Sequence, residues 1–340
     1  MAGIRQEGDF RCTIERQAAW GTPIDSAPIG LNTEDLQITL EGDRHAPPVD
    51  RGVRFNHEDD RFVDTASTIP VARFSGPITY GMLKNVLPGL LQKVTNWTVT
   101  GGAIADVFPE VPANLPTPRA ITSTAGGYCY TIVRKSPTTS PASSERISDA
   151  ILRRLKISLH PTNNSGMLWG EFEFIGTTYS HSVNPAGTIT QDTMAATSIY
   201  TWGDLDDVIL EGGADLLTDF VGFELDMTFG AKFAGDTPRG EVLFPRFEAT
   251  CTATFGQNTQ TQAFEAYTRS QAISTGRSLA LKWGDGTISS AGELHITAFG
   301  SPMTFDDSDR KEGETHVLTL SCEQGGTSTE YPVRFQWWAV

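Results

Sequence analysis

Apolar and polar residues alternate along much of this 340-residue chain, and this period of two predicts a mainly β protein. The most regular stretch is 151–176, where Leu155 and Ile157 are separated by polar residues and precede a turn rich in Asn, Pro and Gly. On the return, two phenylalanines alternate with Glu171 and Glu173. The stretch therefore predicts a β-hairpin with one apolar face and one polar face.

A second stretch, 279–300, repeats this pattern. Leu279, Leu281 and Trp283 alternate with small or polar residues, and a Gly-Asp-Gly turn precedes the return strand. The stretch has the same length as 155–176. Equal length and equal pattern indicate that one is a distant copy of the other, so we expect an internal duplication.

Shorter runs predict the remaining elements. The expected strands are 36–40, 53–55, 69–74, 128–133, 221–229, 247–255, 316–322 and 333–338, with a short strand or turn within 208–217. Helical periodicity predicts helices over 80–92, which a Pro-Gly pair should kink, and over 261–273. Residues 56–67 and 177–203 lack such patterns and predict loops. Each half thus has two strands, one short helix and a hairpin.

These patterns divide the chain into three parts. Residues 1–34 mix charged residues with aromatic residues and proline, and they predict an extended arm with little structure of its own. A first β module is expected over 35–200, interrupted at 95–148 by a loop rich in Pro, Thr and Ser. A second β module is expected over 201–340.

Charge narrows the range of functions. The chain has 41 acidic and 26 basic residues, a formal net charge of −15. Proteins that hold nucleic acid by its phosphates need a basic surface, and this chain has no large cluster of Lys and Arg. We therefore expect no specific nucleic-acid binding, although an acidic surface can repel DNA that passes close to it.

Cysteine usage and hydropathy indicate the compartment. The four cysteines are far apart and form no CxxC pair, which predicts four reduced thiols in or near the core. The first residues lack the apolar segment of a signal peptide, and no apolar run approaches the ~20 residues that span a bilayer. We expect a protein made in a cytosol, without a membrane segment.

Catalytic motifs are missing from the sequence. GxSxG, HExxH and the P-loop pattern do not occur, and no GxGxxG follows a strand. The acidic run 307–313 begins like a calcium loop but places Lys311 where an oxygen ligand is required. The tryptophans could form a sugar platform, although core or interface packing is their more common use. We expect that the protein is not an enzyme and that it binds neither a metal nor a cofactor.

The order of these elements resembles a known family. Trp20-Gly21-Thr22-Pro23 lies in the arm, the strand 36–40 follows, and a strand and helix occupy 74–92. The hairpin 155–176 then returns on a strand that ends in aromatic-Ile-Gly. In this order the chain is similar to the major tail tube proteins of long-tailed bacteriophages.

The resemblance implies a β-sandwich or barrel module with one short flanking helix and a long hairpin. In that family six modules form a ring, and stacked rings make the tube through which DNA enters the host. Two modules in one chain imply that three chains close a pseudo-sixfold ring; one decorated module implies six. The tape measure protein and tail-end proteins would be partners, with assembly in the host cytoplasm and a final place in the virion tail.

The resemblance also directs attention to the surface that would line the tube. The candidate residues are on the polar face of the first hairpin: Lys156, Ser158, Glu171 and Glu173. A lumen dominated by Asp and Glu would let DNA slide through without specific binding. An alternative function remains open, a non-catalytic β-sandwich on a virion that binds carbohydrate or a host receptor.

Overall fold

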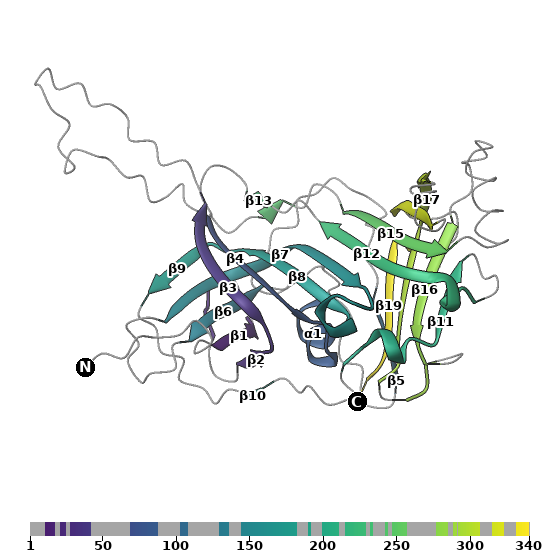
Figure 1. Cartoon of the computed structure of the whole chain (residues 1–340). Coiled ribbons are helices and arrows are strands. Elements are labelled where there is room, and N and C mark those ends of the chain that lie inside the picture. The colour runs from purple at the N-terminus through teal and green to yellow at the C-terminus, as the bar shows by residue number, and fades with distance from the viewer. Residues whose placement is uncertain are drawn as a thin grey trace, which may run out of the picture.

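The structure is a computed structural model, and β-strands dominate it (Figure 1). It describes residues 11–17, 21–24, 28–41, 69–87, 103–107, 129–135, 144–181, 190–191, 199–210, 215–228, 232–233, 242–243, 247–256, 277–284, 288–290, 292–306, 315–322 and 331–339.

The strands are β1 (Arg11–Arg16), β2 (Ile29–Leu31), β3 (Glu34–Glu41), β4 (Ile69–Pro77), β5 (Ala103–Val107), β6 (Tyr130–Lys135), β7 (Glu145–Leu159), β8 (Trp169–Ile175), β9 (Thr178–His181), β10 (Thr190–Gln191), β11 (Asp207–Leu210), β12 (Phe220–Thr228), β13 (Lys232–Phe233), β14 (Val242–Leu243), β15 (Glu248–Gly256), β16 (Arg277–Trp283), β17 (Leu294–Asp306), β18 (Thr315–Cys322) and β19 (Val333–Ala339). The helix α1 is Tyr80–Asn85, and short 3₁₀ turns occupy Asn164–Gly166, Trp202–Asp204 and Leu217–Asp219.

Eight strands form one continuous antiparallel sheet in the order β3-β4-β8-β7-β12-β15-β18-β17, which we call the main sheet. Figure 1 shows most of these strands side by side across the upper part of the molecule. On one face the side chains are buried, among them Phe74, Phe172 and Leu225. The alternation in the sequence thus distinguishes the two faces of this sheet, and the mainly β prediction is confirmed.

Two long strands continue out of the main sheet into a second layer. The N-terminal half of β7 pairs with β6 and β9, and β6 leads on to β1, β2 and β10. The N-terminal half of β17 pairs with β16 and β19, which lead to β11 and β5. All these pairs are antiparallel except β2 with β10. Continuous backbone therefore joins the two layers at β7 and at β17.

The core lies between the main sheet and the second layer. Tyr130 of β6 meets Phe174 of β8 edge to face, with ring centroids 5.9 Å apart. Phe74 of β4 stacks on Phe172 at 5.0 Å and on Phe174 at 5.7 Å. Buried side chains from both halves of the chain form one contiguous cluster. All four cysteines are buried and free, as expected.

The helix α1 covers the first part of this core. Its N-cap is Thr79, whose Oγ1 accepts a hydrogen bond from the backbone N–H of Met82 at 3.2 Å. Met82 is buried against the main sheet cluster. The prediction of a helix at 80–92 is confirmed for Tyr80–Asn85, whereas the predicted helix at 261–273 lies outside the described residues.

Each strand that joins the layers has an unusual residue near its crossing. In β7 this is Asp149, which is buried and has a φ of 54°. The left-handed conformation is uncommon for a residue other than Gly, although Asp adopts it more readily than most. In β17 the crossing lies at Gly300, where an added Cβ would be 2.0 Å from the carbonyl oxygen of Ser321. Only glycine fits so close to the neighbouring backbone.

The two halves of the main sheet have the same pairing order. In each half the strands that come first, second, fourth and third in the chain lie side by side, as β3-β4-β8-β7 and as β12-β15-β18-β17. In the second layer, β6 and β9 flank β7 as β16 and β19 flank β17. β1 then lies beside β6 as β11 lies beside β16.

Both predicted hairpins are present, but they have different places in this order. The stretch 155–176 contains the β7–β8 pair, whereas 279–300 contains the β16–β17 pair. By pairing order the counterpart of β16–β17 is β6–β7. The two hairpins therefore have different places in the pairing order, and an internal duplication stays a prediction. Equal length and alternation are shared by any hairpin with one buried face, so they cannot identify its position in a sheet.

The structure also corrects several expected loops. The arm expected over 1–34 contains β1, which pairs with β6 over six residues, and β2. The loop expected over 177–203 contains β9 and β10, and the one over 95–148 contains β5 and the start of β7 as well as the predicted strand. These strands were missed because their apolar alternation is short or, in early β7, because both faces are buried.

The other strand predictions are confirmed, with boundaries that differ by a few residues. β17 extends to Asp306, beyond the predicted end at Gly300. The predicted strand at 53–55 and the predicted loop at 56–67 lie outside the described residues.

Candidate functional site on the polar face of the sheet

The face of the main sheet that points away from the core is polar in its middle rows, whereas the flanking positions Val71, Ile175, Ile151 and Trp169 on the same side are apolar and buried. Cross-strand register sets its composition, because directly paired residues point to the same side. One row runs through Ser75, Glu171, Lys156, Asp226 and Thr250. We call this surface the polar face.

All four residues predicted to line a lumen lie on the polar face. Lys156 pairs with Glu171 in register, and Ser158 is next on the same side of β7. Glu173 follows Glu171 on the same side of β8. The hairpin thus brings the four side chains to one surface, and whether that surface lines a tube stays a prediction.

Two arginines and two glutamates form a network at the β3 end of this face. Nε of Arg73 donates to Oε2 of Glu173 at 2.8 Å, and its other nitrogen donates to Glu41. Arg153 also donates to Glu173 and lies 3.8 Å from Glu41. Each carboxylate therefore lies between the same two guanidinium groups.

Two further ion pairs cross the boundary between the halves of the sheet. Arg154 of β7 donates through two nitrogens to the carboxylate of Asp226 on β12, with Nε 2.8 Å from Oδ1. Nζ of Lys156, also on β7, lies 3.0 Å from Oε2 of Glu224, which is on β12. Forked Arg–carboxylate pairs are directional, so they help to fix the register of β7 against β12.

These contacts shift the pKa values of the groups involved. Burial raises the pKa of Glu173, but the hydrogen bond from Arg73 and the charge of Arg153 outweigh it and hold this pKa below its ordinary value. The hydrogen bonds to Glu173 and Glu41 raise the pKa of Arg73. Hydrogen bonding to Asp226 likewise raises the pKa of Arg154. Each of these three shifts favours the charged form of the group.

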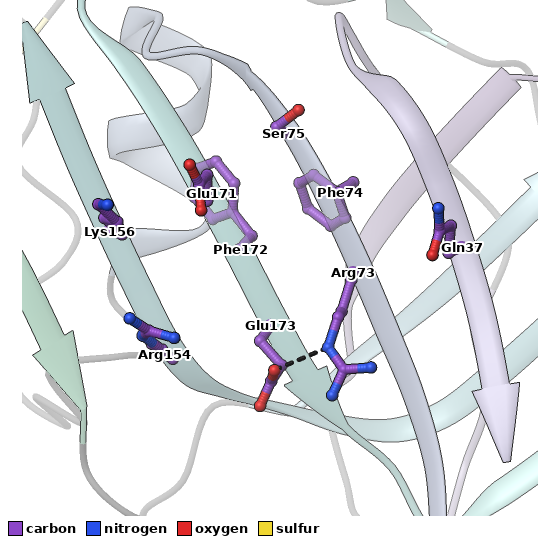
Figure 2. A pocket seen from close by; sticks show the side chains of 9 residues that line it. All are labelled: Gln37, Arg73, Phe74, Ser75, Arg154, Lys156, Glu171, Phe172 and Glu173. Atoms are coloured by element: carbon purple, nitrogen blue, oxygen red, sulfur yellow. Dashed lines mark hydrogen bonds and ion pairs between the residues drawn. The ribbon is translucent and has the colours of Figure 1, made fainter. Parts of the chain in front are cut away.

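A shallow pocket of about 360 Å³ opens on this part of the polar face. Figure 2 shows Arg73 and Glu173 turned toward one another across neighbouring strands, with Arg154 and Lys156 along β7 on the other side of Glu173 and Glu171. The lining residues are Gln37, Arg73, Phe74, Ser75, Arg154, Lys156, Glu171, Phe172 and Glu173. The pocket is thus a hollow among paired charges, open to solvent.

The side chains that the structure describes on the polar face are together close to neutral. Its described cations are Arg73, Arg153, Arg154 and Lys156, and its described carboxylates are Glu41, Glu171, Glu173, Glu224, Asp226 and Glu248. Four cations and six carboxylates give −2, a small part of the chain's −15. Repulsion of DNA by a strongly acidic face is thus not what these residues provide.

The charges are also unevenly distributed along the sheet. They gather on β3, β4, β8, β7 and β12, with Glu248 at the start of β15. Farther on, the described positions of this face carry mostly hydroxyl groups, among them Thr252, Thr254, Thr319 and Ser321. Hydroxyl groups offer hydrogen bonds without net charge, so these four residues add no charge to this half of the face.

Comparison of the sequence with protein-family models and with curated proteins finds no match. Among the described residues, no three His, Cys, Asp or Glu side chains come together in a way that could hold a metal ion. No helix in the described part of the chain is both long enough and apolar enough to cross a membrane.

Sequence reasoning found the polar hairpin but missed the partners of its charges. Glu41 directly follows the predicted strand 36–40, Arg73 lies within the predicted strand 69–74, and Arg153 lies within the predicted hairpin. Alternation assigns such residues to a polar face but does not say which strands are adjacent. Because β8 lies between β4 and β7, Glu173 meets arginines from both.

Proposed function

We propose that this protein is a structural subunit of a bacteriophage tail tube and that it assembles into rings that stack. The observation that carries the proposal is the main sheet, which has an apolar face packed on the second layer, an opposite face with many charged groups and two edges that no described strand covers. A subunit of a continuous sheet-walled tube needs all three. The protein would then act by assembly, without catalysis.

The edges of the main sheet favour closure into a ring. Beyond β3, and beyond the Gly300–Asp306 part of β17, no described strand pairs with the outer edge. All seven strand pairs in the main sheet are antiparallel, so β3 and β17 run in opposite directions. The β3 of one copy could therefore pair antiparallel with the β17 of the next, which continues the sheet and removes the unpaired edges.

The apolar side of β3 favours packing of a second copy of the chain against this edge. Leu36 is buried, Ile38 is half-buried and Leu40 is 43% exposed, although all three point toward the core side. The exposed fraction of these side chains thus increases along β3. A second copy placed against this edge would bury Leu40, as expected for a permanent interface.

The repeated pairing order supports a count of three copies. If β3-β4-β8-β7 and β12-β15-β18-β17 are two tube modules in one chain, then three chains supply six modules around an axis. If the pairing order has another origin, six chains are the alternative. A heterologous interface that closes gives a ring in either case.

Negative-stain electron microscopy of the purified chain tests the proposal. We expect concentration-dependent rings or tubes, with threefold symmetry in top views. Monomers of uniform size at every concentration and salt condition would reject it, and strict sixfold symmetry of whole chains would reject the three-copy arrangement alone.

A further inference from the structure

Every described cation on the polar face has a carboxylate within ion-pair distance. Arg73 contacts Glu41 and Glu173, and Arg153 contacts the same two carboxylates. Arg154 and Lys156 have partners on β12. Arginine and lysine bind DNA through phosphate oxygens, and here carboxylate oxygens occupy the same donors.

The Arg73–Arg153 pair is best arranged for a phosphate. Both guanidinium groups converge on the same anions, and forked arginine donors match the oxygens of a phosphate as well as those of a carboxylate. The side chains of Arg73 and Arg153 are 43% and 29% exposed, so a ligand in solution could reach them. Removing the carboxylates would leave two converging cations at the surface.

We propose that Glu41 and Glu173 act as built-in substitutes for phosphate, which keep Arg73 and Arg153 from holding duplex DNA that moves across the polar face. The proposal rests on the proposed function in naming DNA as the polyanion and in taking the polar face as the surface that DNA passes. Low affinity for DNA would then come from paired charges at a nearly neutral surface and not from bulk negative charge.

The two explanations predict different results when carboxylates are removed. If bulk charge matters, any two carboxylates on the polar face are equivalent. If pairing matters, only those that hold the arginines are important. Glu171 and Glu248 provide the matched control, because they are on the same face and form no ion pair within the described residues.

The test compares the full-length chain with two double variants, E41Q/E173Q and E171Q/E248Q. Binding to a fluorescein-labelled 30-base-pair DNA duplex is measured by anisotropy between 50 and 300 mM NaCl, at protein concentrations below those that give rings. For E41Q/E173Q we expect about tenfold tighter binding at 50 mM NaCl and a slope of log K against log salt that is steeper by about 2, because two phosphate contacts are gained. E171Q/E248Q should stay within about twofold of the unchanged chain.

Equal gains in both double variants would overturn the proposal in favour of bulk charge. No gain in either would overturn it as well, because the released arginines would then not reach phosphate. Adding R73Q and R153Q to E41Q/E173Q should return binding to the original level, and binding that persists would exclude these arginines as its source.

Folding and assembly are followed separately. Circular dichroism shows whether each variant is folded, and the single variant E173Q, with a smaller expected gain, replaces the double variant if that does not fold. Absence of rings in micrographs of the unchanged chain bears on the proposed function alone. Equal DNA binding by the two double variants bears on this inference alone.

Discussion

Asp149 combines burial, a left-handed backbone and three hydrogen bonds to its carboxylate. Its Oδ1 accepts from Nε2 of Gln17 at 2.8 Å and from the backbone N–H of Gly21 at 2.7 Å. Its Oδ2 accepts from Oγ1 of Thr177 at 2.6 Å. The carboxylate thus fastens the segment after β1 to the point where β7 changes layers.

Substitution at Asp149 should separate the contribution of its hydrogen bonds to stability from that of its left-handed backbone. Asp149→Ala leaves buried donors without an acceptor and keeps the unfavourable φ, so we expect a loss of about 3 kcal/mol in the free energy of unfolding. Asp149→Asn keeps one acceptor oxygen and tolerates this φ, and it should cost about 1 kcal/mol. Urea unfolding measures both. Equal losses would show that the hydrogen bonds contribute little.

Glu173 should make stability depend on pH. Its pKa in the folded state lies below the ordinary value of 4.5, so the stability it contributes is fully present above pH 4.5 and is lost as pH falls through the folded pKa. We expect E173Q to be less stable by about 1 kcal/mol at pH 7, a figure that allows for solvent screening. The difference should shrink toward pH 3. Urea unfolding at several pH values checks this, and a difference that does not change with pH contradicts it.

For single residues, the sequence indicates which side chains are polar but not what they contact. Glu171 and Glu173 alternate identically in sequence, yet only Glu173 lies between two arginines. The distinction depends on the bulge in β7 between Leu152 and Arg154, which brings Arg153 toward Glu173. Such bulges have no clear sequence pattern here, so contacts of this kind could not be predicted.

At the scale of elements, β3 has a described partner strand, β4, on one side only. It forms one edge of the main sheet and carries Leu40, the exposed large hydrophobic residue among those described. The unpaired backbone groups at such a sheet edge favour pairing with another chain.

Leu40→Asp should therefore reduce assembly with little effect on the fold. The residue is already exposed in the single chain, so the free energy of unfolding should change by less than about 0.5 kcal/mol. Ring formation should need at least about tenfold higher protein concentration, measured by light scattering and electron microscopy. Thr39→Asp is the control, because it adds the same charge to the opposite side of β3. Equal impairment by both would argue against burial of Leu40.

Elements with long alternation were the easiest to predict. β12, β15, β16 and β18 each have a clear alternation of buried and more exposed positions, and all were found. Residues 147–152 of β7 are all buried, which removes the alternation that would identify this part as a strand. β9 and β10 are too short to show a period. Their strand character comes from partners distant in sequence.

At the scale of the whole molecule, the two halves of the chain share a sheet and a core. β7 pairs with β12 over six residues, which joins strands on either side of residue 200. Phe223, Leu225 and Met227 of β12 belong to the same buried cluster as Leu155 and its neighbours. The halves are therefore expected to unfold together.

The buried thiols allow this to be measured without any substitution. Burial raises the pKa of Cys129 to about 12 and raises that of Cys251 well above its ordinary value, so both should resist alkylation in the folded state. Pulsed alkylation at increasing urea, read by mass spectrometry, reports one thiol in each half. We expect the same midpoint for both. Midpoints more than about 0.5 M apart would show two separate units.

The backbone of β7 and β17 passes unbroken from one layer to the other. Sliding of one layer across the other would therefore have to tear both ladders at once, on either side of Asp149 and of Gly300. Covalent backbone as well as side-chain packing therefore resists a force that pushes one layer across the other. A hollow filament of such subunits would be stiff under shear, since each protomer braces its inner and outer walls with its own strands.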